Sequence, residues 1–289
     1  ALPFTAIMLL LCYSLWRGLQ SDQCHQAQQP APATQFWSGH HWQQRLRQLA
    51  LQAVERGWSE AEERRVAASA ALLPVGELGQ AYWGSLRGPI RAFAPRLFAE
   101  RPQQAPQPLL VDVQLAGVHL HGWLDGVTEA GLFGYRLRDL GPWELAGFWL
   151  RHLLLNIAAG DGIARDSRLL SPRSEWRLGP LADPQALLAP WLAAYREALL
   201  APLPLFARAS HGFAYKSRHP GRKEPLDAAR SEARTHWLGN DYLAAEALDP
   251  WNALAFRGVD PLGERFEQLA EALYGPALDA LQGDAEDDA

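Results

Sequence analysis

The sequence is poor in cysteine and has no excess of positive charge. Two cysteines, Cys12 and Cys24, occur among 289 residues, so a disulfide framework is excluded and a reducing cytoplasm is expected. The net charge of −5 argues against a protein that coats nucleic acid over its whole surface, because that function needs a basic surface. Local basic patches stay open. No GxxxxGK[ST] loop occurs, so we expect no ATP hydrolysis by this chain.

The chain also lacks an apolar run of the length that crosses a membrane. Residues 2–16 are apolar and uncharged, but a spanning helix needs about 20 residues. The basic region and small-x-small cleavage site of a signal peptide are missing too. We interpret this run as a buried segment or the remnant of an imperfect gene start, with a membrane tether as the alternative. The first residue is Ala, which indicates a fragment or a processed chain.

What is present is enough apolar material for a full core, with 48% of residues hydrophobic. Composition divides the chain into four parts, which are an apolar segment with a polar linker (1–35), a helical unit (36–105), a β-rich domain (106–282) and an acidic tail (283–289). The first and last parts are expected to be poorly ordered. Twelve tryptophans are more easily explained as core than as stacking platforms, although a Trp-rich carbohydrate-binding module is a further alternative.

The helical unit begins with an apolar stripe at helical spacing over residues 42–54. Ser59 and Glu62 then form a capping box, which predicts the start of a second helix. Pro89 and Pro95 are expected to break the following segment into short pieces. Adjacent histidines at 40 and 41 point about 100° apart on a helix, so we expect no shared metal there.

The β-rich domain opens with three predicted strands, at 110–115, 118–124 and 132–138. The two-residue sequence Ala116-Gly117 predicts a tight hairpin turn between the first two strands. A largely apolar helix is predicted from Pro142 to about Ile157, buried against the sheet. Further strands at 167–171 and 175–178 and several helices follow, so the fold class is α+β (mixed α/β).

His119 and His121 lie two residues apart and therefore share one face of the second strand. This spacing suits a metal pair, and it also suits two histidines on the solvent side with Val118, Leu120 and Gly122 facing inward. Because no cysteine or third histidine lies nearby in the sequence, we favour the solvent side and predict no metal site.

Asp125 is predicted at the end of the second strand, where a metal-dependent nuclease would place its first carboxylate. Such an enzyme also needs an acid-x-lysine on the next strand to hold Mg²⁺ and orient water. The next strand offers Arg136, Leu137, Arg138 and Asp139 instead, and a cation there would repel Mg²⁺. We therefore predict a nuclease-like strand layout without the chemistry, with Asp125 as a turn residue. An active nuclease using Asp125 with Glu144 or Asp161 is the alternative.

The densest basic run is YKSRHPGRK, at residues 215–223. It follows Phe213 and could contact a phosphate backbone or be a solvated loop, and the sequence leaves both open. The DNA-binding candidates are the cations of this run and the two arginines of the third strand: Arg136, Arg138, Lys216, Arg218, Arg222 and Lys223.

Several blocks in order resemble the C-terminal region of the RecC family, the gamma subunit of exodeoxyribonuclease V (RecBCD). They are GVHLHGWLDGVTEAGLFGYR, ELAGFWLRHLLLNIAAG, EWRLGPLADPQALLAPWLAAYREALLAPLPL and GFAYK, preceded by QFWSGHHWQQRLRQLALQ and LLPVGELGQAYW. The resemblance covers residues 35–274.

The resemblance implies a domain similar to a PD-(D/E)XK nuclease that lacks the catalytic set. It also implies a non-catalytic subunit of a helicase–nuclease for double-strand-break repair by homologous recombination. Its partners would be RecB, RecD and double- and single-stranded DNA at a fork, and its role subunit assembly and strand guidance. Mg²⁺ and ATP would belong to the partner subunits. The family residues that read Chi lie in a helicase-like part that precedes this region, so none is carried over.

Overall fold

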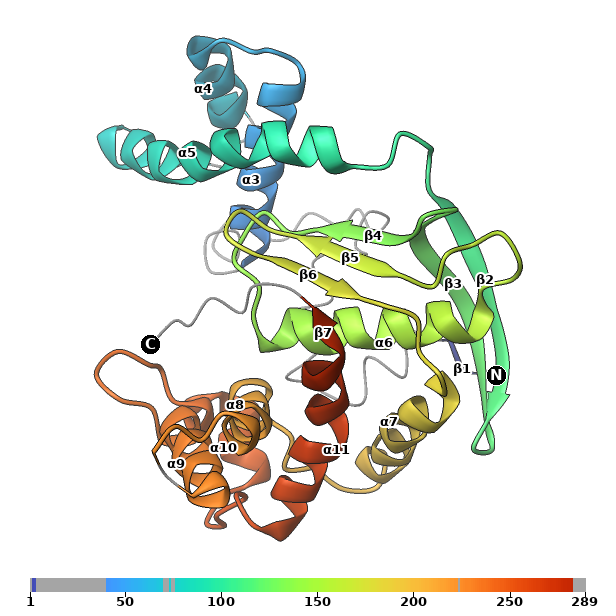
Figure 1. The fold of residues 1–289 in the computed structure, drawn as a ribbon. Helices are drawn as coiled ribbons and strands as arrows, with labels where there is room; N and C mark the ends of the chain where they lie inside the picture. The colour runs from blue at the N-terminus through green and yellow to red at the C-terminus, as the bar shows by residue number, and fades with distance from the viewer. Residues whose placement is uncertain (1, 4–39, 70–72, 74–75, 223, 283–289) are drawn as a thin grey trace.

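The computed structural model describes residues 2–3, 40–69, 73, 76–222 and 224–282. Its centre is a seven-stranded mixed sheet that is flanked by helices (Figure 1). The expected linker, both cysteines, the acidic tail and most of the first apolar run lie outside the described residues. Strand β1 (Leu2–Pro3) belongs to that run and pairs in parallel with β3.

The sheet combines antiparallel and parallel pairs. Strand β3 pairs with β1, β2 and β4, and the order then runs through β5 and β6 to β7. The β4–β5 pair is parallel, and its connection passes through α6. The mixed fold class predicted from the sequence is therefore confirmed. The remaining strands are β2 (Gln107–Leu115), β3 (Val118–Thr128), β4 (Gly131–Tyr135), β5 (Ser167–Leu170), β6 (Glu175–Leu178) and β7 (Leu281–Gln282).

The β2–β3 hairpin turns where the sequence predicts. Ala116 and Gly117 have φ angles of 50° and 73°, as a type I′ turn requires at both central positions. This turn places Leu115 opposite Val118 and so fixes the register in which β2 and β3 pair.

Strand β3 is longer than predicted, and this corrects the position of Asp125. Between the pairs Leu109–Leu124 and Gln107–Val127, β3 contributes one residue more than β2. Gly126 has a φ of 80° in this irregularity, and a Cβ there would lie 2.8 Å from the Phe133 carbonyl oxygen. Asp125 is therefore a residue beside a β-bulge inside β3, and the prediction that it closes the strand is wrong.

Helix α6 (Pro142–Ala158) packs on one face of the sheet, with α7 (Pro184–Ala198) and α11 (Glu264–Ala280) behind it (Figure 1). Its apolar side chains are buried on nearly all sides, as predicted. Its one fully buried histidine, His152, bonds to Ser167 Oγ at 2.7 Å and to the Gly179 carbonyl at 3.0 Å. This helix therefore anchors β5 and the loop after β6 as well as the core.

The helical unit consists of α3 (His40–Glu55), α4 (Glu60–Ser69) and α5 (Glu77–Glu100). The capping box is confirmed, because the Glu62 carboxylate accepts from the Ser59 nitrogen at 2.8 Å. The predicted break at the prolines is wrong, since α5 continues through Pro89 and Pro95. Side chains buried on both sides of each proline, such as Ile90 and Leu97, offset the lost backbone bonds.

This unit packs on the sheet face opposite α6, where it covers strands β4 and β5. Phe133 and Tyr135 of β4 and Leu170 of β5 belong to the hydrophobic cluster of α3 and α5. An ion-pair network joins the same parts: Arg96 Nη2 lies 2.6 Å from Glu175 Oε2, and Arg168 bonds to both Glu100 and Glu175. Burial opposes ionisation of Glu175, but the bonds from Arg168 and Arg177 prevail and lower its pKa to about 2.

A helical lobe follows α7 and is tied back through α11 (Figure 1). It contains α8 (Ala207–Arg218), α9 (Pro225–Leu238), the short η2 (Glu246–Leu248) and α10 (Pro250–Ala255). Phe206, Phe213, Trp237 and Phe266 form its aromatic core. None of the described helices combines the length and the hydropathy that crossing a membrane requires.

Candidate functional site

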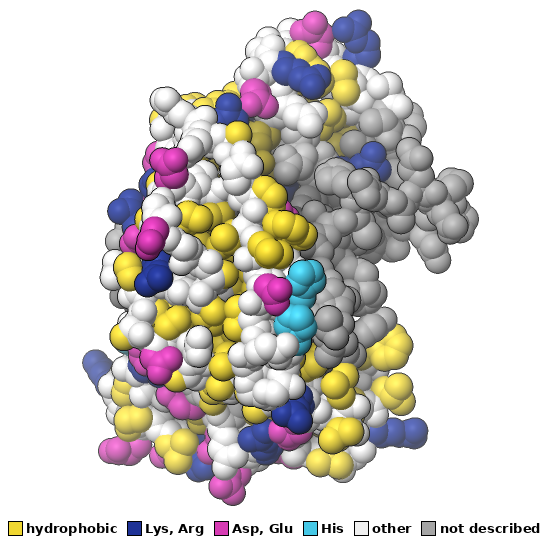
Figure 2. All heavy atoms as spheres, turned by 90° about the vertical axis from the view of Figure 1, so that its right-hand side faces the viewer, with side chains coloured by type: hydrophobic (Ala, Val, Ile, Leu, Met, Phe, Trp, Pro, Cys, Tyr) yellow, Lys and Arg dark blue, Asp and Glu magenta, His cyan; other side chains and the backbone are white. Residues whose placement is uncertain are grey.

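The outward face of the β2–β3 hairpin carries polar and aromatic side chains that the core does not use. Three cross-strand pairs point away from α6: Leu110 with Trp123, Asp112 with His121, and Gln114 with His119. Trp123 is 60% exposed, although tryptophan is usually largely buried. Figure 2 shows histidine and acidic side chains side by side on this face, with hydrophobic side chains around them.

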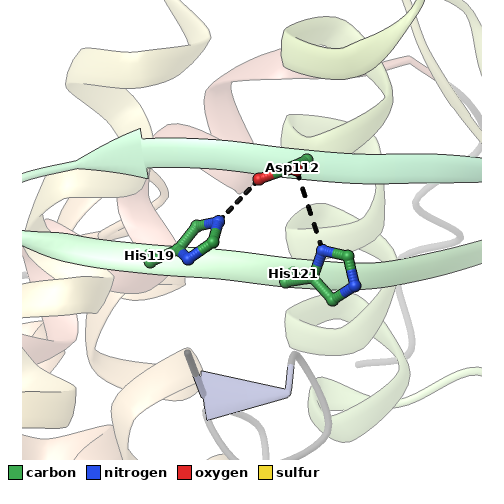
Figure 3. A group of neighbouring side chains, drawn as sticks. All are labelled: Asp112, His119 and His121. Atoms are coloured by element: carbon green, nitrogen blue, oxygen red, sulfur yellow. Dashed lines mark hydrogen bonds and ion pairs between the residues drawn. The ribbon is translucent and has the colours of Figure 1, made fainter.

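Asp112, His119 and His121 converge on this face (Figure 3). His119 Nε2 lies 2.6 Å from Asp112 Oδ1, and His121 Nδ1 lies 3.9 Å from Asp112 Oδ2. The hydrogen bond from His119 lowers the pKa of the Asp112 carboxyl, although slight desolvation raises it. The predicted solvent-facing placement of both histidines is confirmed, since Leu120 between them is 1% exposed.

Asp112 is the member that the sequence argument missed. The prediction of no metal depended on the lack of a cysteine or third histidine near the pair and did not include a carboxylate on the neighbouring strand. The signal was available, because a two-residue turn at 116–117 sets residue 112 opposite residue 121. Among the described residues this is the group of three or more ligand-type side chains whose ligand atoms lie within 4.8 Å of one another.

Asp125 shares the outward face with these histidines, but the described carboxylates do not gather around it. Its backbone oxygen accepts from Arg151 Nη2 of α6 at 2.5 Å. Glu144 is buried at the start of α6, where its Oε2 accepts from the Gly141 nitrogen at 3.1 Å and its Oε1 from Arg138 at 2.5 Å. Asp161 lies in the turn after α6. Within the described part of the chain, no cluster of three metal-ligand groups includes any of these acids.

The two arginines predicted on the third strand lie just beyond β4. Arg136 still bonds to β5, because its backbone nitrogen donates to the Leu170 carbonyl at 2.7 Å. Its guanidinium donates to the Tyr135 carbonyl at 3.1 Å. Arg138 is held by Glu144, so part of its charge is already neutralised.

The basic run is partly helix and partly turn, so it is not a loop over its whole length. Lys216 and Arg218 lie in the last turn of α8. Arg218 binds Asp279 Oδ1 at 2.6 Å and Glu271 Oε1 at 2.8 Å, both on α11, and the Asp279 bond raises its pKa. Arg222 is exposed in the following turn, and Lys223 lies outside the described residues. The structure therefore separates Arg218, which joins two helices, from Lys216 and Arg222.

A second surface feature lies in the helical lobe, between the end of α9 and the loop after α10. Within these 22 positions, six large apolar side chains are exposed, of which Tyr242 is 97% and Leu248 80% exposed. This stretch is not recognisable in the sequence, because scattered apolar residues between helices give no periodic signal. The set, called the lobe patch below, is Leu238, Tyr242, Leu248, Trp251, Leu254 and Val259.

Comparisons with known proteins point to one family. A family model described as the RecC C-terminal domain matches residues 24–218. The chain is 32% identical over 234 residues to the RecBCD enzyme subunit RecC of Escherichia coli K12, which covers 78% of this chain and 20% of that protein. It is 23% identical over 186 residues to the RecBCD enzyme subunit RecC of Buchnera aphidicola (subsp. Schizaphis graminum).

These matches cover only a small part of each relative's own length. The chain spans about a fifth of the length of the two RecC subunits that it matches. A shorter match, 41% identical over 56 residues, is to an uncharacterized transporter of Haemophilus influenzae and covers 19% of this chain and 8% of that protein.

Proposed function

This chain belongs to the RecC C-terminal domain family, and we propose on that basis that it acts by contact and not by cleavage. It is a non-catalytic part of a bacterial helicase–nuclease that repairs double-strand breaks by homologous recombination, with RecB and RecD as its protein partners. The observation that carries this proposal is the family match over residues 24–218 together with 32% identity to a RecBCD subunit.

The lobe patch supports the assembly part of the proposal. Contiguous exposed apolar surfaces commonly mark protein–protein contacts, and the six exposed apolar side chains of the lobe patch all come from 22 consecutive positions. Trp251 and Tyr242 are also of the residue types that dominate interface energies. We therefore assign the lobe patch to contact with a partner subunit.

The mixed sheet supports the nuclease-like part. It has Asp125 beside a β-bulge, a feature that is frequent next to active sites. The following strand, β4, carries neither an acid nor a lysine, and two arginines come just after it, whereas a PD-(D/E)XK nuclease would supply an acid-x-lysine there. We propose that the layout of this nuclease fold is retained and that its catalytic set is lost.

Strand guidance would depend on cations that are not held in internal ion pairs. Lys216 and Arg222 meet this description better than Arg138 and Arg218, which neutralise carboxylates of the same chain. Phosphate contacts of this kind position a strand without reading its sequence. Arg136 and Lys223 remain candidates. The Mg²⁺ and ATP of the reaction would be held by the partner subunits, and the complex would work in the cytoplasm.

The alternative function is an active Mg²⁺-dependent nuclease that uses Asp125 with Glu144 or Asp161. Glu144 is poorly placed for this role, because ending its bonds to Arg138 and Gly141 would leave a buried charge without partners. An assay with linear DNA and Mg²⁺ decides the matter. We expect no cleavage that depends on Asp125, so wild type and Asp125→Ala should give the same background, with Asp139→Ala as the control on another exposed acid.

Assembly is tested by co-purification of the tagged chain with RecB and RecD expressed together. Recovery of at least one subunit is the expected result. Failure to recover either subunit, with the chain folded by circular dichroism, would contradict the proposal.

A further inference from the structure

We propose that Asp112, His119 and His121 bind one divalent transition-metal ion on the outward face of the β2–β3 hairpin, with Zn²⁺ as the representative ion. Three protein ligands from two paired strands would hold the ion, and water would complete the coordination. This inference does not depend on the proposed function, because it rests on three side chains and the register that brings them together.

The geometry is close to what a tetrahedral site needs. Zn²⁺ binds imidazole nitrogen and carboxylate oxygen at about 2.0–2.2 Å, which places neighbouring ligand atoms about 3.3 Å apart. The observed 2.6 Å from His119 Nε2 to Asp112 Oδ1 and 3.9 Å from His121 Nδ1 to Asp112 Oδ2 lie on either side of this value. The two rings come from one strand face, with centroids 6.1 Å apart (Figure 3). One ligand atom from each of the three side chains lies within 4.8 Å of the other two, so side-chain rotations that move these atoms by about 1–1.5 Å bring them to tetrahedral spacing.

The scaffold favours the site as well. His119 and His121 lie on the central strand of three, and Asp112 is held opposite His121 by the backbone pairing of the hairpin. Ligands on rigid strands lose less freedom on binding than ligands on loops. Figure 2 shows that the group is open to solvent, so an ion can enter without unfolding.

The ligand types select the class of metal. Two imidazoles and one carboxylate suit Zn²⁺, Ni²⁺ or Cu²⁺, whereas Mg²⁺ takes oxygen ligands. The site is thus distinct from a nuclease Mg²⁺ site at Asp125. On binding, the Nε2 proton of neutral His119 moves to Nδ1, and a protonated ring would first release one proton to solvent. Affinity therefore falls as the pH is lowered.

A bound ion would join β2, which pairs with β3 alone among the described strands, to its neighbour. Since the ion binds the folded hairpin and not the separated strands, it would raise the melting temperature by an amount that grows with the logarithm of the free metal concentration once that concentration exceeds Kd. The ion would also replace the hydrogen bond between His119 and Asp112 with two metal–ligand bonds.

The test is isothermal titration of the whole chain with ZnCl₂ at pH 7.5, together with melting curves with and without the metal. Wild type is compared with His119→Ala, His121→Ala and Asp112→Asn, and the matched control is His219→Ala, an exposed histidine at the end of α8. All four side chains are at least partly exposed, so we expect every variant to fold.

The three site variants should each lose one Zn²⁺ equivalent or bind it at least about tenfold more weakly, the lower end of what outer-shell changes cost. They should also lose the metal-dependent rise in melting temperature, while His219→Ala retains both. Mg²⁺ should produce neither effect. Unchanged stoichiometry, affinity and melting shift in the three variants would overturn the proposal, even if the chain binds Zn²⁺ elsewhere.

Discussion

The two faces of the β2–β3 hairpin differ strongly in burial. The inward face, with Val111, Leu120 and Leu124, is almost fully buried against α6. The outward face carries Trp123 and His121 in the open, although α3 and α5 cover the same side of the sheet over β4 and β5. The inward face is explained by packing, and the outward face is available for binding.

The largest effect should come from the inward face. Leu120→Ala removes a side chain that is 1% exposed, leaves a cavity against α6 and should lower the free energy of unfolding by about 2–5 kcal/mol. Urea denaturation measures this change. A loss below about 1 kcal/mol would mean that the core collapses around the site, and the contrast between the faces would then be weaker than the burial implies.

The dependence of stability on pH extends the comparison to His152, a buried histidine of α6. Burial lowers the pKa of His152 from 6.5 to about 4, against the opposing effect of its bond to the Gly179 carbonyl. Between pH 6.5 and about 4 the unfolded chain binds a proton that the folded chain excludes. Stability is thus retained in full above pH 6.5 and falls as the pH drops, by about 3 kcal/mol at most from this group.

His152→Gln should therefore show a flatter dependence of unfolding free energy on pH across this window, measured by urea denaturation at intervals from pH 7.5 to 4. Wild type on the same series is the control. Parallel curves for the two proteins would show that His152 does not contribute to acid sensitivity.

The smallest effect should come from the outward face. Trp123→Ala should cost about 1 kcal/mol or less, despite the size of the side chain, because Trp123 is 60% exposed. The measurement is the same urea titration as for Leu120→Ala. Equal losses at the two positions would show that Trp123 packs against part of this chain and is not free for a ligand or partner.

Local patterns in the sequence were sufficient for most elements. The stripe of α3, the capping box at Ser59 and the all-round hydrophobicity of α6 each reflect short-range physics, and the structure contains all three. The type I′ turn at 116–117 is of the same kind. These features depend on neighbours within a few residues, so one sequence reveals them.

Features that depend on distant parts of the chain were not accessible in this way. The continuity of α5 through Pro89 and Pro95 depends on its burial against α3 and the sheet. Strand β7 pairs with β6 from about a hundred residues further along the chain. The bulge at Gly126 appears only when β3 is paired with β2, so the place of Asp125 could not be derived from its own strand.

The site was partly predictable for the same reason. The shared face of His119 and His121 follows from the strand period, whereas Asp112 joins them through cross-strand pairing. The ion pairs that hold Arg138 and Arg218 come from Glu144, Glu271 and Asp279, and the pairs to α11 link parts far apart in sequence. Charge in a sequence does not distinguish a free cation from a neutralised one.

The most direct test of action by contact is the affinity of the chain for an immobilised RecB–RecD preparation. It is measured for the wild type and for a variant whose lobe patch is made polar. The double variant Leu248→Ser and Trp251→Ser should weaken binding by more than about tenfold, as expected for interface anchors. The matched control is Leu200→Ser, which changes a side chain that is 89% exposed outside the patch, and it should bind like wild type. Equal binding by all three proteins would contradict the assignment of the lobe patch, and no binding by wild type would contradict the proposed function itself.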